Sequence, residues 1–175
     1  MPQDAVPIAG LARGDPGAFS ALYRTYRARL VQYALSLLHG LMEAEDVVHD
    51  VFVGLAKQLG EGHVPRDVAA YLYASVRNRC VDRMRRKREQ PLDDAELELI
   101  VAAPDDAERL ALQRLLNRAL LALPSEQAEV VVLRTWHDLE FAAIAALQGT
   151  SINTALSRYQ YGLTKLRKEL GAHGR

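Results

Sequence analysis

Basic side chains gather along one side of a predicted helix, at a density suited to binding phosphate groups. The segment Asp67–Arg88 has an apolar residue at every fourth position, so we expect one side of it to be buried. Within the segment, only Asp82 opposes the cations on the other side. Such a face suits a DNA backbone, although a solvated basic helix end has the same pattern. The apolar residues are Val68, Leu72, Val76, Cys80 and Met84, and the cations are Arg77, Arg79, Arg83, Arg85, Arg86, Lys87 and Arg88.

A second group of polar residues opens the last predicted helix, which should begin after a cap at Ser151 and run to about Leu170. A tight turn at Gln148-Gly149-Thr150 separates it from a short helix over 140–147. This order is that of a helix-turn-helix, whose second helix contacts base edges with its N-terminal residues. An ordinary pair of packed helices joined by a glycine turn would have the same sequence pattern. The residues placed for this contact are Ser151, Asn153, Thr154, Ser157 and Arg158.

A third group is acidic and lies on a helix predicted from Glu43 to Leu59. Its apolar residues, among them Val47, Val51 and Leu55, fall on one side. The opposite side carries Glu45, Asp46, His49 and Asp50. Carboxylates in the first turns also suit the positive end of a helix dipole, so their position alone does not assign a function.

Residue patterns typical of enzymes are missing from the sequence. The five histidines show no metal-binding spacing, so neither a metal site nor a cofactor is predicted. We find no glycine-rich phosphate loop and no nucleophile elbow, and we do not expect an enzyme. A single cysteine, Cys80, excludes intrachain disulfides and cysteine zinc clusters, and it fits a reducing cytoplasm. No membrane span or signal peptide is predicted.

The net charge of zero hides three blocks of different sign. Residues 1–88 hold 13 Lys and Arg against 9 Asp and Glu, and residues 108–175 hold 9 against 6. Between them, residues 89–107 hold 7 acidic residues and no basic one. This pattern predicts two domains, 1–88 and 107–175, joined by an acidic linker over 89–106. A structural protein with a solvated loop could share it.

Every other segment with a clear period is helical, and no strand pattern is found, so the predicted fold is all-α. A helical turn is expected at Ile8–Ala12, followed by a helix capped by Asp15, opened by Pro16 and stopped by Gly40. After Pro124, Ser125 should cap a helix to about Trp136. The residues expected on the buried side of the last helix are Ile152, Ala155, Leu156, Tyr159, Leu163 and Leu166.

Taken together, these stretches resemble bacterial RNA polymerase sigma factors of the extracytoplasmic-function group, from about Gly14 to Leu170. The likeness rests on four stretches: 21–38, Ala44–Phe52, Ala70–Asp82 with the arginines that follow, and 123–158. No single motif decides it, but their joint order and spacing do. The resemblance implies two helical domains that bind core RNA polymerase and promoter DNA, regulation by an anti-sigma factor, and no catalysis in the chain itself.

The resemblance also assigns roles to residues. It implies that the acidic row Glu45, Asp46, His49 and Asp50 docks on the polymerase. It implies that the loop 60–66 and Asn78 frame a pocket for a flipped base of the minus-ten element, and that Ser151 to Arg158 contact the minus-thirty-five element. The residues expected to hold the minus-ten strand are Tyr71, Arg77, Asn78, Arg79, Arg83, Arg85, Arg86 and Lys87. Tyr71 and Tyr73 could stack on bases, although tyrosines at helical spacing are more often part of a core.

One departure from the family lies in the last helix. Where relatives usually carry more Lys or Arg, this chain has Leu156, Tyr161 and Leu163, and Gly162 costs a helix about 1 kcal/mol relative to Ala. We therefore expect weaker and less salt-sensitive upstream binding, which is compatible with a weak upstream contact or with an unusual promoter. Two other functions are compatible with the pattern: a sigma-like decoy for an anti-sigma factor, which has no need of the basic run, and a helix-turn-helix regulator without polymerase, which has no need of the acidic row.

Overall fold

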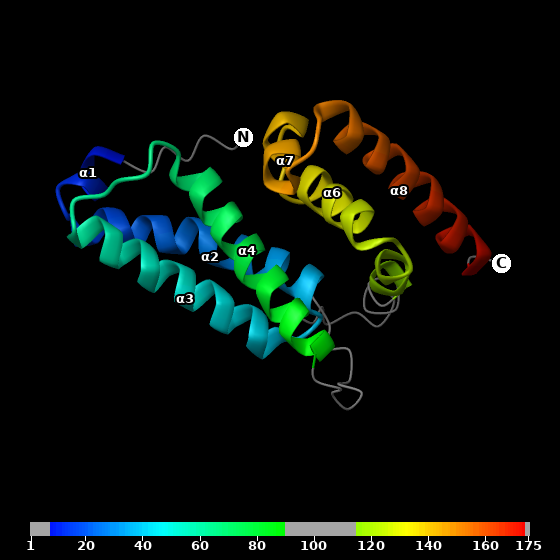
Figure 1. Cartoon of the computed structure of the whole chain (residues 1–175), viewed down its shortest axis with the longest axis horizontal. Coiled ribbons are helices and arrows are strands. Elements are labelled where there is room, and N and C mark those ends of the chain that lie inside the picture. Colours follow the sequence, from blue (N-terminus) through cyan, green and yellow to red (C-terminus); the bar gives the residue numbers. More distant parts are fainter. Residues whose placement is uncertain (1–7, 90–114, 174–175) are drawn as a thin grey trace. The chain divides into compact units, whose positions relative to one another are not determined.

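The computed structural model describes residues 8–89 and 115–173, and side chains over 10–86 and 115–171. The chain divides into two compact units, Met1–Glu96 and Leu97–Arg175. Within the described ranges all regular elements are helices, which confirms the predicted all-α, two-unit fold (Figure 1). The predicted linker, apart from Glu89 at the end of a helix, and residues 107–114 lie outside the described part, so the proposed domain limits stay predictions.

The first unit is a bundle of three long helices preceded by a short one. They are α1 (Ile8–Ala12), α2 (Pro16–Leu38), α3 (Leu41–Gly60) and α4 (Val68–Glu89). The helices α2 and α3 lie side by side, and α4 packs against both of them (Figure 1). Their shared core is apolar, and its largest fully buried side chains include Leu22, Leu30, Tyr33, Val47, Val51, Leu55 and Leu72.

A polar side chain caps the start of α2. The Gly17 amide donates to Asp15 Oδ1 at 2.8 Å, and Pro16 is the first helical residue, as predicted. The end of α2 was predicted one residue too late. His39 takes the left-handed conformation (φ 64°) that closes the helix, and its amide donates to Leu35. Gly40 instead precedes α3, whose first turn therefore starts two residues before the predicted Glu43.

The helix α4 begins with a cap from Asp67, whose Oδ1 accepts the Ala70 amide at 2.9 Å. Its predicted stripe is buried at Val68, Leu72, Val76 and Cys80, whereas Met84 is half-buried. Tyr73 is also in the core, with its ring 5.6 Å from that of Tyr33. Burial raises the pKa of the Tyr73 phenol well above its usual value. Tyr73 is therefore a packing residue and is not exposed for base stacking.

The second unit consists of a helix over 115–121 followed by α6 (Ser125–Thr135), α7 (Phe141–Gln148) and α8 (Ile152–His173). Ser125 was predicted as the cap of α6, but the cap position is Pro124 and Ser125 is the first helical residue. The turn between α7 and α8 follows the prediction: Gly149 has φ 63° and Ser151 Oγ accepts the Thr154 amide at 3.1 Å.

A close contact between α6 and α8 determines which side of α8 is buried. Gly162 faces α6, where a Cβ atom would lie 2.8 Å from Val131 Cγ2. Gly162 thus allows the two helices to approach, which offsets its low helix propensity. The buried side passes through Ala155, Gly162 and Leu166. Ile152 and Leu156 were predicted to lie inward, and this was wrong: they are 54% and 39% exposed.

Candidate functional site

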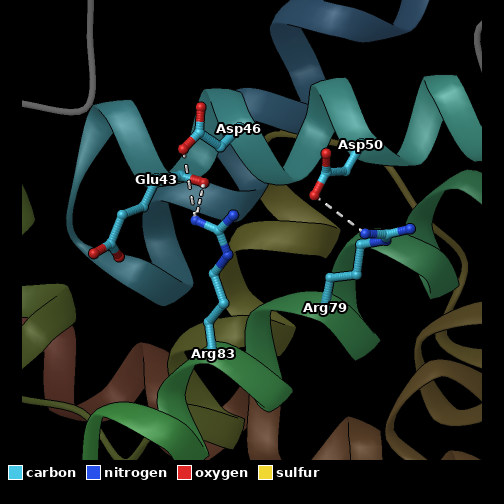
Figure 2. A network of polar contacts seen from close by, with 5 residues as sticks. All are labelled: Glu43, Asp46, Asp50, Arg79 and Arg83. Carbon is cyan, nitrogen blue, oxygen red and sulfur yellow. Dashed lines mark hydrogen bonds and ion pairs between the residues drawn. The ribbon is translucent and has the colours of Figure 1, made fainter. Parts of the chain in front are cut away.

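The acidic row of α3 and the basic row of α4 meet each other across the helix pair (Figure 2). The Arg79 guanidinium lies 3.2 Å from Asp50 Oδ2, with the Gly54 position beside it. One turn further along α4, Arg83 Nη1 lies 3.9 Å from Asp46 Oδ2 and 3.4 Å from the main-chain carbonyl of Glu43. The Glu43 carboxylate points away from this guanidinium (Figure 2). We call these contacts the α3–α4 ion pairs.

These ion pairs add carboxylates of α3 to Asp82, the one acidic residue that the sequence places among the arginines of α4. Asp82 does pair with Arg85 at 3.6 Å, but Asp46 and Asp50 also face the basic row, from a helix about thirty residues earlier. Both side chains of the Arg79–Asp50 pair are about half exposed, so the pair contributes about 0–1 kcal/mol to stability. Weak, accessible pairs of this kind can be exchanged for a ligand at low cost.

The remaining predicted minus-ten residues differ in exposure. Asn78, Arg85 and Arg86 are exposed, whereas Tyr71, Arg77 and Arg83 are partly buried. The Lys87 side chain lies outside the described residues. The exposed cations Arg85 and Arg86 are neighbours in the last turns of α4, and exposed Asp82 lies between them and Asn78.

The exposed face of α3 contains two apolar residues that the sequence interpretation missed. Met42 is 78% exposed and Val53 is 55% exposed. Together with His49 they follow the helical spacing of seven and four residues, so all three lie along one side of α3. The sequence contains a signal for this exposure, because Met42 and Val53 are apolar but lie outside the buried stripe of Val47, Val51 and Leu55. Glu45 on this helix is paired with Arg27 of α2 at 2.9 Å.

In the second unit, the predicted base-contacting residues open α8. Ser151, Asn153, Thr154 and Ser157 are all exposed. The hydroxyls of Ser151 and Thr154 lie 2.8 Å apart, in addition to the cap at the Thr154 amide. Asn153 and Ser157 are one turn apart and face away from the buried Ala155. A polar surface at the N-terminal turns of the second helix is what a helix-turn-helix offers to base edges.

Arg158 lies with this group in the sequence but has a different environment. It is partly buried, and its Nη1 donates to Gln148 Oε1 at 2.7 Å. The Gln148 amide in turn donates to Glu129 Oε2 at 2.7 Å and to the Glu126 carbonyl at 3.0 Å. This chain of hydrogen bonds ties α8 and the end of α7 to the buried Glu129 of α6. Arg158 therefore holds the helix-turn-helix together.

A second arginine, Arg134, also makes its contacts within the second unit. Arg134 Nη1 lies 3.4 Å from Asp138 Oδ1 and 3.6 Å from Glu140 Oε1. It also donates to the Leu139 carbonyl at 3.2 Å, and its guanidinium lies over the Phe141 ring at 5.4 Å. It thereby fixes the loop between α6 and α7.

Comparisons with known proteins agree with this arrangement. The family model of Sigma-70 region 2 matches residues 22–90, and that of Sigma-70, region 4 matches residues 113–166. The first match covers most of α2 and all of α3 and α4, and the second covers α6, α7 and most of α8. Together they define a sigma-70-type transcription initiation factor.

The full-length relatives place the chain within that class. It is 31% identical over 173 residues to the ECF RNA polymerase sigma factor SigL of Mycobacterium tuberculosis, covering 94% of this chain and 97% of the relative. It is 27% identical over 176 residues to the ECF RNA polymerase sigma factor SigW of Bacillus subtilis, covering 93% and 94%. The chain belongs to the ECF RNA polymerase sigma factors, and its function is to direct transcription initiation at specific promoters.

Two solved structures of similar chains are complexes with a second protein. One holds CnrH with the cytosolic domain of CnrY (TM-score 0.70, 26% identity, 94% of this chain and 95% of that one covered). Another holds the sigma factor RpoE with the anti-sigma factor NepR from Bartonella quintana (TM-score 0.72, 26% identity, 87% and 96% covered). In the part of this chain that the structure describes, none of the helices has the length and apolar character needed to cross a membrane.

Proposed function

We propose that the tasks of a promoter-specificity factor are divided among three surfaces of this chain. The exposed face of α3 binds core RNA polymerase, the basic face of α4 with the loop 60–66 holds the minus-ten strand, and the start of α8 meets the minus-thirty-five element. The chain contributes binding and no catalysis of its own, and it acts in the cytoplasm with the polymerase. The observation that carries the proposal is the meeting of acidic and basic rows on adjacent helices of the region 2 unit.

The α3 surface has the composition of a docking site. Met42 and Val53 are exposed apolar groups that a partner can bury, and burial of such anchors contributes most of the affinity at interfaces. Asp46 and Asp50 lie on the same helix and supply charge, which sets orientation and association rate. Basic groups on the polymerase would complement this row.

The α4 surface suits single-stranded DNA. Arg85 and Arg86 are exposed and can follow a phosphate backbone. Asn78 is exposed about two turns before them, beside the position where the resemblance puts the flipped base. Flipping a base costs a few kcal/mol, which several phosphate contacts can offset.

We further propose that an anti-sigma factor regulates the chain. Two similar chains were solved in complex with a second protein, which in one case is named as an anti-sigma factor. A partner that covers the exposed apolar residues of α3 would compete with the polymerase for the same surface.

The test is reconstitution with core polymerase, followed by run-off transcription on genomic fragments. We expect cognate transcripts from the wild-type chain. Paired reversal of Asp46→Arg and Asp50→Arg should abolish core binding in a pull-down, whereas Glu61→Arg, an exposed acidic residue at the end of α3, should not.

Two results would contradict the proposal. Core binding without open-complex formation on any promoter fragment would instead indicate a decoy for an anti-sigma factor. Retained function in the double reversal would indicate a regulator that works without polymerase.

A further inference from the structure

The first two turns of α8 expose apolar side chains beside polar ones. Ile152, the first residue of the helix, is 54% exposed, and Leu156, one turn later, is 39% exposed. They flank the exposed row of Asn153 and Ser157. The buried side of α8 runs along Ala155, Gly162 and Leu166. The exposed surface of Ile152 and Leu156 is therefore not packed in the core of the unit.

The exposed side chains in the first two turns of α8 are uncharged. Between Ser151 and Tyr161 the sequence holds one charged residue, Arg158, and it is engaged with Gln148. The exposed cations of α8 are Lys165, Arg167 and Lys168, more than two turns further along. Contact at the N-terminal turns must therefore come from neutral hydrogen-bonding groups and from apolar surface.

Base edges in the major groove present one apolar group, the C5-methyl of thymine. A helix-turn-helix places the N-terminal residues of its second helix against those edges. We propose that Ile152 and Leu156 determine promoter specificity by contacting thymine methyl groups in the upstream element, while Asn153 and Ser157 supply hydrogen bonds. The inference rests on the proposed function, since it requires that α8 enters the minus-thirty-five element.

Geometry limits the spacing of these thymines. Residues four apart on a helix are separated by about 6 Å along its axis. Successive base pairs rise by about 3.4 Å. The two methyl groups should therefore lie one or two base pairs apart. Removing one methyl from such a contact should weaken binding about fourfold, which corresponds to about 0.8 kcal/mol.

The experiment changes the DNA first, so that the protein stays intact. Holoenzyme reconstituted with core polymerase selects from duplexes in which the upstream element is randomised. In the best selected duplex, each thymine is then replaced by deoxyuridine, which removes only the methyl group. We expect two positions, one or two base pairs apart, at which the wild-type holoenzyme binds about fourfold more weakly.

Protein variants then assign each methyl to a side chain. Ile152→Ala should lose the sensitivity at one of the two positions, and Leu156→Ala at the other, because each variant removes the partner of that methyl. Leu121→Ala is the matched control: Leu121 is an exposed apolar residue of the same unit, on the helix over 115–121, and this variant should keep both sensitivities.

Three outcomes would overturn the inference. If an upstream element is selected but no thymine is sensitive to methyl removal, only the methyl contact is refuted and the proposed function stands. If Ile152→Ala and Leu156→Ala reduce holoenzyme assembly without changing base selectivity, these residues contact a protein. If no upstream element is selected, the proposed role of α8 fails together with the inference.

Discussion

The two units place their arginines differently. In the first, Arg79 and Arg83 reach across to carboxylates of a neighbouring helix while staying partly accessible, and Arg85 and Arg86 remain exposed. In the second, Arg134 and Arg158 are directed into their own unit and stabilise its loop and turn. The surface left at the start of α8 is neutral. The difference suggests that α4 supplies most of the DNA affinity, whereas α8 supplies selectivity among bases.

The largest effect is expected from charge reversal on α4. Replacing Arg83→Glu and Arg86→Glu removes two potential phosphate contacts and adds repulsion, so open-complex formation should fall by at least about a hundredfold. Permanganate footprinting of the minus-ten region would measure it. Arg24→Glu, an exposed arginine of α2, is the control and should stay near wild type. Normal opening by the α4 variant would refute the assignment of affinity to α4.

A smaller effect is expected from Arg158→Ala. Loss of its hydrogen bond to Gln148 should lower the free energy of unfolding of the second unit by about 1–2 kcal/mol, with only a severalfold loss of promoter opening. Urea denaturation followed by the fluorescence of Trp136, the single tryptophan, reports on this unit. Arg167→Ala, an exposed arginine of the same helix, should leave stability unchanged. A larger loss of opening than for the α4 variant would reverse the comparison.

The smallest effect concerns the α3–α4 ion pairs. Asp50→Asn removes the partner of Arg79, so the free protein should bind a single-stranded minus-ten oligonucleotide a few times more tightly. Fluorescence anisotropy at low salt would measure this gain, which should shrink in 0.5 M salt because exposed pairs are screened. Asp67→Asn provides no such gain, since Asp67 caps α4 at its other end. Unchanged affinity for Asp50→Asn would show that the pair does not limit DNA access.

Much of the fold was predictable because it depends on local signals. Asp15 with Pro16, and Ser151, act as expected, and the buried side of α3 follows its stripe from Val47 to Leu55. The pairing of Arg79 with Asp50 was not predictable, because it depends on how two helices pack, which their separate periodicities do not determine.

The errors on α8 have the same origin. Ile152 and Leu156 have helical spacing, but the close approach at Gly162 moves the contact with α6 to the side of Ala155 and leaves them exposed. A stripe in the sequence predicts which residues share a side. It does not predict how many of those residues will be buried when the helix packs against its neighbour. The residue types of the candidate surfaces were predicted, whereas their partners required the structure.

The α3–α4 ion pairs also link two binding events. A cationic group that pairs with Asp46 or Asp50 competes with Arg83 or Arg79, and thereby leaves a guanidinium available for phosphate. Thermodynamic linkage then requires reciprocity: if polymerase on α3 raises the affinity of α4 for DNA by some factor, DNA on α4 raises the affinity of α3 for polymerase by the same factor. Through these contacts the factor would hold promoter DNA more tightly in the holoenzyme than alone.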